Sequence, residues 1–282
     1  MAHELHFDCT MCGRCCRDLH LPLTLHEALT WIADGHDVEV LCVAMPWPVE
    51  PPAEHAESAY RRARSFFARS GLLRVRISVI LAADLVGACP NLSADLRCVI
   101  HPRRPLVCRI YPYEINPFVA LQPADKACPP EAWSTDRPLL QSDRGIVSET
   151  LQADVQAARK AALDGVGTRQ LLCEELGLNT AAVVNEGYVI HPIDRSKLTE
   201  ALQRALTSGA QAAPERHWDL VSDRPLTLDA LAAVGAVGLP GPGLEVRPYR
   251  YRSYRYLKAL KMASQAAAAQ PAGAQTAVKP SP

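Results

Sequence analysis

The clearest hydrophobic pattern in the chain runs through "LLRVRISVILAADL", residues 72–85. In this stretch Val75, Ile77 and Val79 alternate with polar side chains. Successive side chains of a strand point to opposite faces of a sheet, so the alternation predicts a strand with one buried face.

The segments before this strand carry helix and loop signals. Thr24 is followed three residues later by Glu27, and Gly35 ends the apolar pattern, which predicts a capping box, a helix and a glycine stop. The proline-rich segment 45–55 is expected to be a surface loop. The basic stretch 55–71 predicts a helix that ends at its glycine.

After residue 140 the composition shifts to Ala, Leu, Glu and Arg, and four stretches have recognisable helix starts and stops: residues 148–165, 168–177, 194–209 and 227–235. The last residues form a low-complexity tail that is expected to be disordered. The sequence therefore predicts an α+β protein in which an irregular, metal-nucleated, cysteine-rich N-terminal domain precedes an α-helical C-terminal half. The expected boundaries are 1–135 for the cysteine domain, 136–262 for the helical region and 263–282 for the tail.

Composition narrows the range of partners and locations. The 282 residues hold 30 Lys and Arg against 30 Asp and Glu, so no net charge attracts nucleic acid or an anionic membrane. The N-terminal segment has no basic and apolar leader pattern, and no apolar run is long enough to span a membrane, so we expect a cytoplasmic protein. Because cytosolic thiols are kept reduced, a dense cysteine pattern there favours metal binding or catalysis over disulfides.

Four of the ten cysteines lie in "DCTMCGRCCRD", residues 8–18. Cys9, Cys12 and Cys15 have the spacing with which bacterial ferredoxins hold an iron–sulfur cubane, whose last ligand comes from a Cys-Pro dipeptide. The adjacent Cys16 breaks that analogy, because neighbouring side chains of an extended segment point in opposite directions. We therefore expect either that Cys15 and Cys16 bind different centres or that only one of them is a ligand.

A second set of cysteines follows downstream. Polar turn residues between Cys89 and Cys98 predict a hairpin that brings the two thiols together, and Cys108 and Cys128 lie in the proline-rich stretch beyond. Soft thiolate ligands select zinc, copper(I) or iron–sulfur clusters. The number of cysteines permits one centre or two. Cys42 and Cys173 lie in apolar surroundings and are expected to be core residues.

Residues 5–130 resemble the YkgJ-type cysteine-cluster family, a zinc- or iron-chelating domain with a CxxCxxCC motif. The resemblance rests on "CTMCGRCC", "CPNL" with a following "RC", "RPLVCRIYP" and the late "CP". His101 stands where a tyrosine is usual, and residues 136–282 are not covered. The resemblance implies that the metal ligands are eight cysteines: Cys9, Cys12, Cys15, Cys16, Cys89, Cys98, Cys108 and Cys128.

The function that follows is metal binding, with an iron–sulfur cluster, [4Fe–4S] by the ferredoxin-like spacing, in a redox or oxidoreductase-accessory role. One alternative is a zinc-stabilised module whose helical half holds a protein partner. Another is a protein lysine methylase, because a related branch of the family resembles flagellin N-methylases. In each case the metal ion or cluster would supply cohesion that proline-rich loops cannot.

Several residues outside the thiols have two open interpretations. Arg104 and Arg109 either hydrogen-bond to the cluster or thiolates as cofactor-binding residues, or pair with acidic surface groups. His101 is expected to be no ligand. The interleaved Arg and Tyr residues in 247–261 suit phosphate contact and base stacking, but an exposed surface element is the preferred interpretation, and nucleic acid is not an expected partner.

Overall fold

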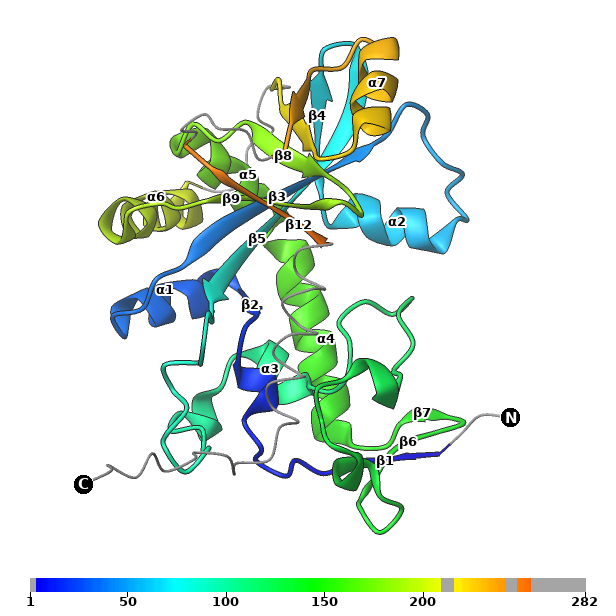
Figure 1. The fold of residues 1–282 in the computed structure, drawn as a ribbon, viewed down its shortest axis with the longest axis vertical. Coiled ribbons are helices and arrows are strands. Elements are labelled where there is room, and N and C mark those ends of the chain that lie inside the picture. Colours follow the sequence, from blue (N-terminus) through cyan, green and yellow to red (C-terminus); the bar gives the residue numbers. More distant parts are fainter. Residues whose placement is uncertain (1–3, 209–215, 242–247, 255–282) are drawn as a thin grey trace, which may run out of the picture.

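The fold is organised around a mixed sheet, in a computed structural model that describes residues 4–208, 216–241 and 248–254 (Figure 1). The sheet has nine strands among the described residues, and β11, β10, β8, β3, β5 and β2 follow one another in that order. In addition, β4 pairs with β5, β9 pairs with β3, and β12 pairs with β9. The strand bounds are β2 His20–Leu23, β3 Glu39–Pro46, β4 Phe66–Ser70, β5 Leu73–Asp84, β8 Thr180–Val183, β9 Gly187–His191, β10 Asp219–Ser222, β11 Gly238–Pro240 and β12 Arg250–Ser253.

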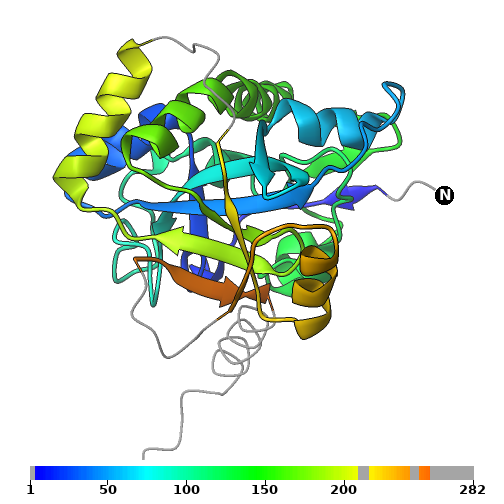
Figure 2. The same cartoon turned by 90° about the horizontal axis from the view of Figure 1, so that it is seen from above.

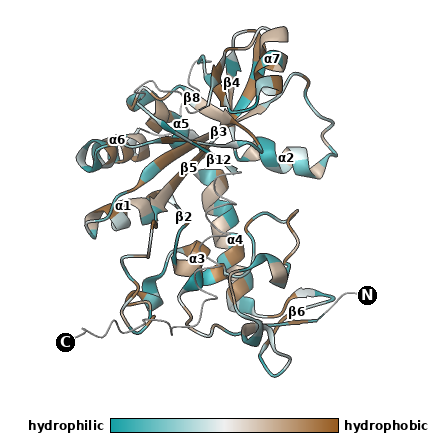
Figure 3. Ribbon diagram, viewed as in Figure 1, coloured by the Kyte–Doolittle hydropathy of each residue, from teal (hydrophilic) through white to brown (hydrophobic). Residues whose placement is uncertain are grey.

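The α-helices lie on or beside this sheet, and their bounds are α1 Leu25–Ala33, α2 Ala56–Ala63, α3 Leu106–Ile110, α4 Glu149–Asp164, α5 Val166–Glu175, α6 Arg195–Thr207 and α7 Pro225–Ala233. Buried side chains of α1, α5 and α6 join one core cluster with residues of β3 and β5. Seen from above, α5 and α6 lie on one side of the sheet, and α7 lies away from them, beside β10 and β11 (Figure 2). The hydropathy colouring shows the apolar residues along β3 and β5 (Figure 3).

The predicted strand is confirmed as β5, whose alternating side chains Val75, Ile77 and Val79 are buried. The predicted capping box is also confirmed. Thr24 Oγ1 accepts a hydrogen bond from the Glu27 backbone N–H at 3.2 Å, and Glu27 Oε2 accepts one from the Thr24 N–H at 2.8 Å. The sequence therefore encodes these two elements locally.

The basic helix predicted for residues 55–71 was wrong in its second half. Helix α2 ends at Ala63, and Phe66–Ser70 forms β4, which pairs antiparallel with β5. The aromatic and small side chains of β4 alternate between buried and more exposed positions, so the sheet gains a strand that local helix propensity does not predict. Gly71 makes the turn in the left-handed region, at φ 54°.

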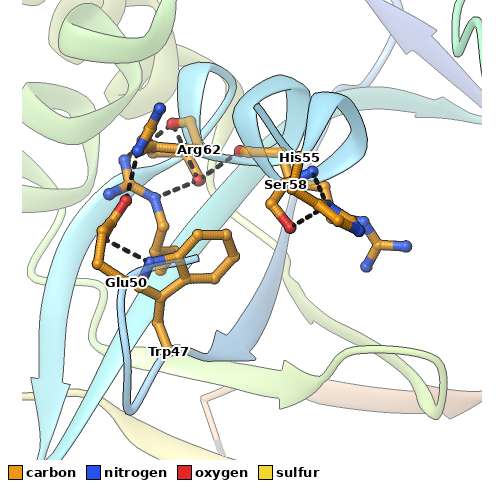
Figure 4. Close-up of polar contacts among 8 residues, drawn as sticks. Trp47, Glu50, His55, Ser58 and Arg62 are labelled. Carbon is orange, nitrogen blue, oxygen red and sulfur yellow. Dashed lines mark hydrogen bonds and ion pairs between the residues drawn. The ribbon is translucent and has the colours of Figure 1, made fainter. Parts of the chain in front are cut away.

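The proline-rich segment 45–55 is only partly a loop, because β3 continues to Pro46 and Trp47 is buried. Glu50 accepts hydrogen bonds from Trp47 Nε1 at 2.8 Å and from Arg62 Nη1 at 2.5 Å, while His55 Nδ1 accepts one from the Ser58 N–H at 3.2 Å at the start of α2 (Figure 4). These bonds attach the segment to α2.

The second half of the chain is not only helical. The four predicted helices are present as α4, α5, α6 and α7, but the strands from β8 to β12 pair with one another and with β3 in the central sheet. The protein is therefore a mixed α/β structure, and the expected division into a cysteine domain and a helical half is not confirmed. The tail predicted for 263–282 lies outside the described residues.

The cysteine-bearing loops lie at one end of the sheet, below β2 and β5 in the view of Figure 1. They are accompanied by a small sheet of β1 (Leu5–His6), β6 (Leu139–Ser142) and β7 (Gly145–Ile146). Helix α4 packs against α3 through Val155, Ala158 and Ile110. In Figure 1, α4 runs from this end of the molecule up to the sheet, so it connects the two regions.

Candidate metal centre

The first cysteine motif forms a tight loop before β2. Arg14–Cys16 is a single 3-10 turn, and the preceding Gly13 has φ 68°. A Cβ atom at Gly13 would lie 3.3 Å from both Leu92 and Leu96, so a glycine allows the close approach of the downstream hairpin. The turn also changes one expectation. The segment is not extended, and the Sγ atoms of Cys15 and Cys16 lie only 4.0 Å apart.

The second cysteine set is brought to the first by backbone hydrogen bonds. The Cys89 N–H donates to the Cys16 carbonyl oxygen at 2.7 Å, and Leu92 and Cys98 form an antiparallel bridge. The predicted hairpin between Cys89 and Cys98 is therefore present. Burial raises the pKa of Cys89, and the neighbouring thiols of Cys16 and Cys98 add to the rise.

Cys108 joins this group from α3. Burial, and then the neighbouring thiols of Cys16 and Cys89, raise the pKa of Cys108 to about 12. Helix α3 is held by Glu27, whose Oε1 accepts a hydrogen bond from the Leu106 N–H at 2.7 Å. The capping residue of α1 therefore also positions the helix that carries Cys108. We call the group formed by Cys16, Cys89, Cys98 and Cys108 the inner set.

The remaining four cysteines form a second group around Tyr111. Burial raises the pKa of Cys128, and the nearby Cys12 and Cys9 add to the rise. The Cys15 pKa is raised chiefly by its hydrogen bond to Cys16 and by burial, with smaller effects from Cys128 and Cys9. We call Cys9, Cys12, Cys15 and Cys128 the outer set, because Cys9 is exposed to solvent.

Tyr111 is a site residue to which the sequence analysis gave no role. Its hydroxyl oxygen accepts a hydrogen bond from the Ala127 N–H at 3.2 Å and lies 3.5 Å from the Cys128 sulfur. Burial is the main reason that the pKa of Tyr111 is raised, so the hydroxyl is held neutral. The only signal in the sequence is its position three residues after Cys108.

The two arginines differ in their surroundings. Arg104 lowers the pKa of Cys16 and that of Cys108, although it is not the largest influence on either thiol. Arg109 is exposed and forms an ion pair with Asp154 of α4 at 3.1 Å. Its expected contact with a cluster stays a prediction. His101 is exposed in a 3-10 turn.

Several buried polar atoms without hydrogen-bond partners belong to residues that are close to the cysteines in the sequence. They are Thr10 Oγ1, Asn91 Nδ2, Arg104 Nε and Trp133 Nε1. Thr10 follows Cys9 directly, and the Asn91 backbone N–H favours the Cys89 thiolate. Buried donors that lack acceptors cost free energy. Because thiolate or sulfide sulfur can accept such bonds, these residues fit a metal–sulfur centre.

The two cysteines that lie outside the sets have the predicted role. Cys42 in β3 and Cys173 in α5 are both buried in the core, and burial and the contact with Cys173 raise the pKa of Cys42. None of the helices in the part of the chain that the structure describes is both long and apolar enough to cross a membrane.

Comparisons with known proteins agree with this site. Residues 8–129 match the CxxCxxCC family model, described as "Putative zinc- or iron-chelating domain". No curated protein and no solved structure matches the chain. The match begins just before Cys9 and ends just after Cys128, so it contains all eight cysteines of the inner and outer sets. Residues 8–129 of this chain thus match a family described as zinc- or iron-chelating over the stretch that holds the eight cysteines, and metal binding is the function that this family description supports.

Proposed function

We propose that the protein is an iron–sulfur redox protein in which the inner and outer sets each provide four thiolates to a [4Fe–4S] cluster. The observation that carries the proposal is the convergence of the two cysteine segments, because the Cys89 N–H donates to the Cys16 carbonyl oxygen at 2.7 Å and the sulfur atoms of Cys15 and Cys16 lie 4.0 Å apart. Four thiolates are the usual ligand set of such a cluster. The match of residues 8–129 to a family model described as zinc- or iron-chelating supports it.

The sequence spacing of the first cysteines favours a cluster over mononuclear zinc. Cys9, Cys12 and Cys15 follow one another at intervals of three residues, which is the spacing with which bacterial ferredoxins hold a cubane. Among the described residues, no three cysteines have sulfur atoms that all lie within 4.8 Å of one another, as three ligands of one tetrahedral zinc ion would.

The surrounding residues would have defined tasks around such a centre. An iron–sulfur cluster supplies one-electron chemistry when it is bound. Arg104 would offset the negative charge of the inner set, and the amide of Asn91 would donate toward sulfur. Tyr111 would hold the Cys128 side chain of the outer set. Cys9 is exposed and the other cysteines of the two sets are partly buried, so solvent would reach the outer set at Cys9.

Anaerobic purification followed by elemental analysis and visible spectroscopy tests this proposal. We expect iron and acid-labile sulfide in equal amounts, little zinc, and a broad visible absorption that bleaches on chemical reduction. A colourless protein that contains zinc and no sulfide would overturn it and would favour the zinc-stabilised module. No contact among the described residues favours the lysine-methylase alternative.

Cysteine variants separate the two sets. Cys12→Ser should lower the iron content by about half if each set holds its own cluster, and Cys98→Ser should do the same. The matched control is Cys173→Ala, which removes a buried thiol outside both sets and should leave iron and sulfide unchanged. Equal loss of all iron in both serine variants would instead indicate one shared centre.

A further inference from the structure

A group of polar side chains on the central sheet contains no cysteine and has no role in the proposed redox function. His20 in β2 pairs across the antiparallel ladder with Asp84 in β5, and Glu39 in β3 pairs with Ala82 of β5. Residues directly opposite each other share a face, and so do residues two apart on one strand. The register therefore places His20, Glu39 and Asp84 on one face of three neighbouring strands.

Their donor atoms converge. The Nε2 atom of His20 lies 3.4 Å from Glu39 Oε2 and 3.9 Å from Asp84 Oδ1. One donor atom from each of the three residues lies within 4.8 Å of the others. A tetrahedral site with metal–ligand bonds of about 2.1 Å has donors about 3.4 Å apart, so small side-chain adjustments would complete the geometry.

Two arginines of β12 hold the carboxylates from the outside. Arg250 pairs with Oε1 of Glu39, and Arg252 lies 3.8 Å from Oδ2 of Asp84. Each carboxylate therefore uses one oxygen for an arginine and turns the other toward His20. The positive charges of the arginines offset the negative charges of the two carboxylates. A cation would therefore be bound here by direct bonds to its ligand atoms more than by the net negative charge of the site.

The imidazole is the observation that points to a ligand. The His20 side chain is only 9% exposed, and the Glu39 side chain only 11%. Even so, His20 Nε2 and Glu39 Oε2 have no hydrogen-bond partner. Buried polar atoms that face one another without a bond are costly, and a metal ion between them would satisfy both. The Asp84 side chain is 22% exposed, which leaves one side open to solvent.

We propose that His20, Glu39 and Asp84 form a second metal site, which takes a divalent transition-metal ion such as Mn²⁺, Fe²⁺ or Zn²⁺. One imidazole and two carboxylates are a harder donor set than thiolates and suit these ions. The site goes beyond the proposed redox function, because it uses no cysteine and lies on the sheet.

Titration of the full-length, anaerobically purified protein with Mn²⁺ tests the site, since Mn²⁺ prefers oxygen and nitrogen donors to thiolates. Electron paramagnetic resonance measures free Mn²⁺ as the protein takes it up. We expect one Mn²⁺ per chain in the unaltered protein, and loss of this binding in His20→Gln and in Asp84→Asn. Iron and sulfide contents should be the same in all of these proteins.

The matched control is His217→Gln, because His217 also lies beside an aspartate, Asp219, at 3.0 Å, but is exposed. This variant should bind Mn²⁺ as the unaltered protein does. Thermal unfolding gives a second measurement, because Mn²⁺ should stabilise the unaltered protein and His217→Gln but not His20→Gln. The proposal is overturned if the unaltered protein takes up no Mn²⁺, or if His20→Gln and Asp84→Asn bind it equally well. A zinc-only, sulfide-free protein would refute the redox function and leave this site untouched.

Discussion

Replacing Glu27 by alanine tests how the fold holds Cys108 in place. The Glu27 carboxylate accepts the Thr24 N–H at 2.8 Å and the Leu106 N–H at 2.7 Å, so one side chain completes the first turns of both α1 and α3. Helix α3 has five residues and no side-chain cap of its own. Glu27→Ala would therefore leave the start of α3 without its only side-chain acceptor.

The expected loss follows from these two bonds. Losing part of a capping box costs about 0.5–1 kcal/mol. Losing a hydrogen bond to a charged group, with its partly buried donor left unpaired, costs about 1.5–3 kcal/mol. We expect Glu27→Ala to lower the free energy of unfolding by about 2–4 kcal/mol. Glu27→Gln keeps one carbonyl oxygen and should lose about half as much.

Urea unfolding of the metal-loaded protein, followed by circular dichroism, measures the change in the free energy of unfolding. The control is Glu57→Ala, which removes an exposed ion pair with Arg61 on α2 and should cost no more than about 0.5 kcal/mol. Loading of the inner set should fall in Glu27→Ala but not in Glu57→Ala. If the two variants unfold at the same urea concentration and carry the same metal, Glu27 does not position α3 as argued.

Four further predictions can be checked separately. Ile77→Ala leaves a cavity in a fully buried part of β5 and should cost about 2–5 kcal/mol in urea unfolding. Gly13→Ala and Gly87→Ala both strain a positive φ, but only at Gly13 does the new methyl group meet leucine side chains, so only that variant should lower metal content. Burial lowers the pKa of His191 below its usual 6.5, so the unfolded chain binds more protons at acid pH, and His191→Gln should reduce the loss of stability as the pH falls below about 6.5. Removal of metal by a chelator should speed hydrogen exchange in residues 98–130 and leave β3 and β5 protected.

The sequence predicted those parts of the fold that depend on local signals. The capping box at Thr24 and Glu27, the alternation in β5 and the helices after residue 140 each lie within one continuous segment. Strands β8 and β10 have four residues each, and such short segments do not distinguish strand from helix. Strand β8 joins the sheet by pairing with β3, which is far away in the sequence, and β10 joins it by pairing with β8.

The two candidate metal sites differ in how far the sequence alone predicts them. The cysteines could be recognised because thiols are rare and closely spaced, and the motif spacing indicated metal ligands in one centre or two. His20, Glu39 and Asp84 come from three separate strands, and only the sheet register brings them together. Their one sequence signal is a polar residue within or beside an apolar run. The contact between Tyr111 and Cys128 is equally hard to predict from the sequence, because these residues meet only in the folded chain.

We expect the metal and the central sheet to contribute unequally to holding the two cysteine sets in position. Cys16 and Cys89 lie just beyond the paired ends of β2 and β5, and hydrogen bonds between Leu85 and Leu19, at 2.9 Å, and between Cys89 and Cys16, at 2.7 Å, continue that pairing. The hydrophobic core beneath β5 therefore fixes half of the inner set before any metal arrives. The outer set has no such support, because Cys9, Cys12 and Cys128 lie outside helices and strands. We therefore expect the free energy of metal binding to contribute most to the folding of the outer set and the proline-rich loops, whereas Cys16 and Cys89 of the inner set are organised by the sheet.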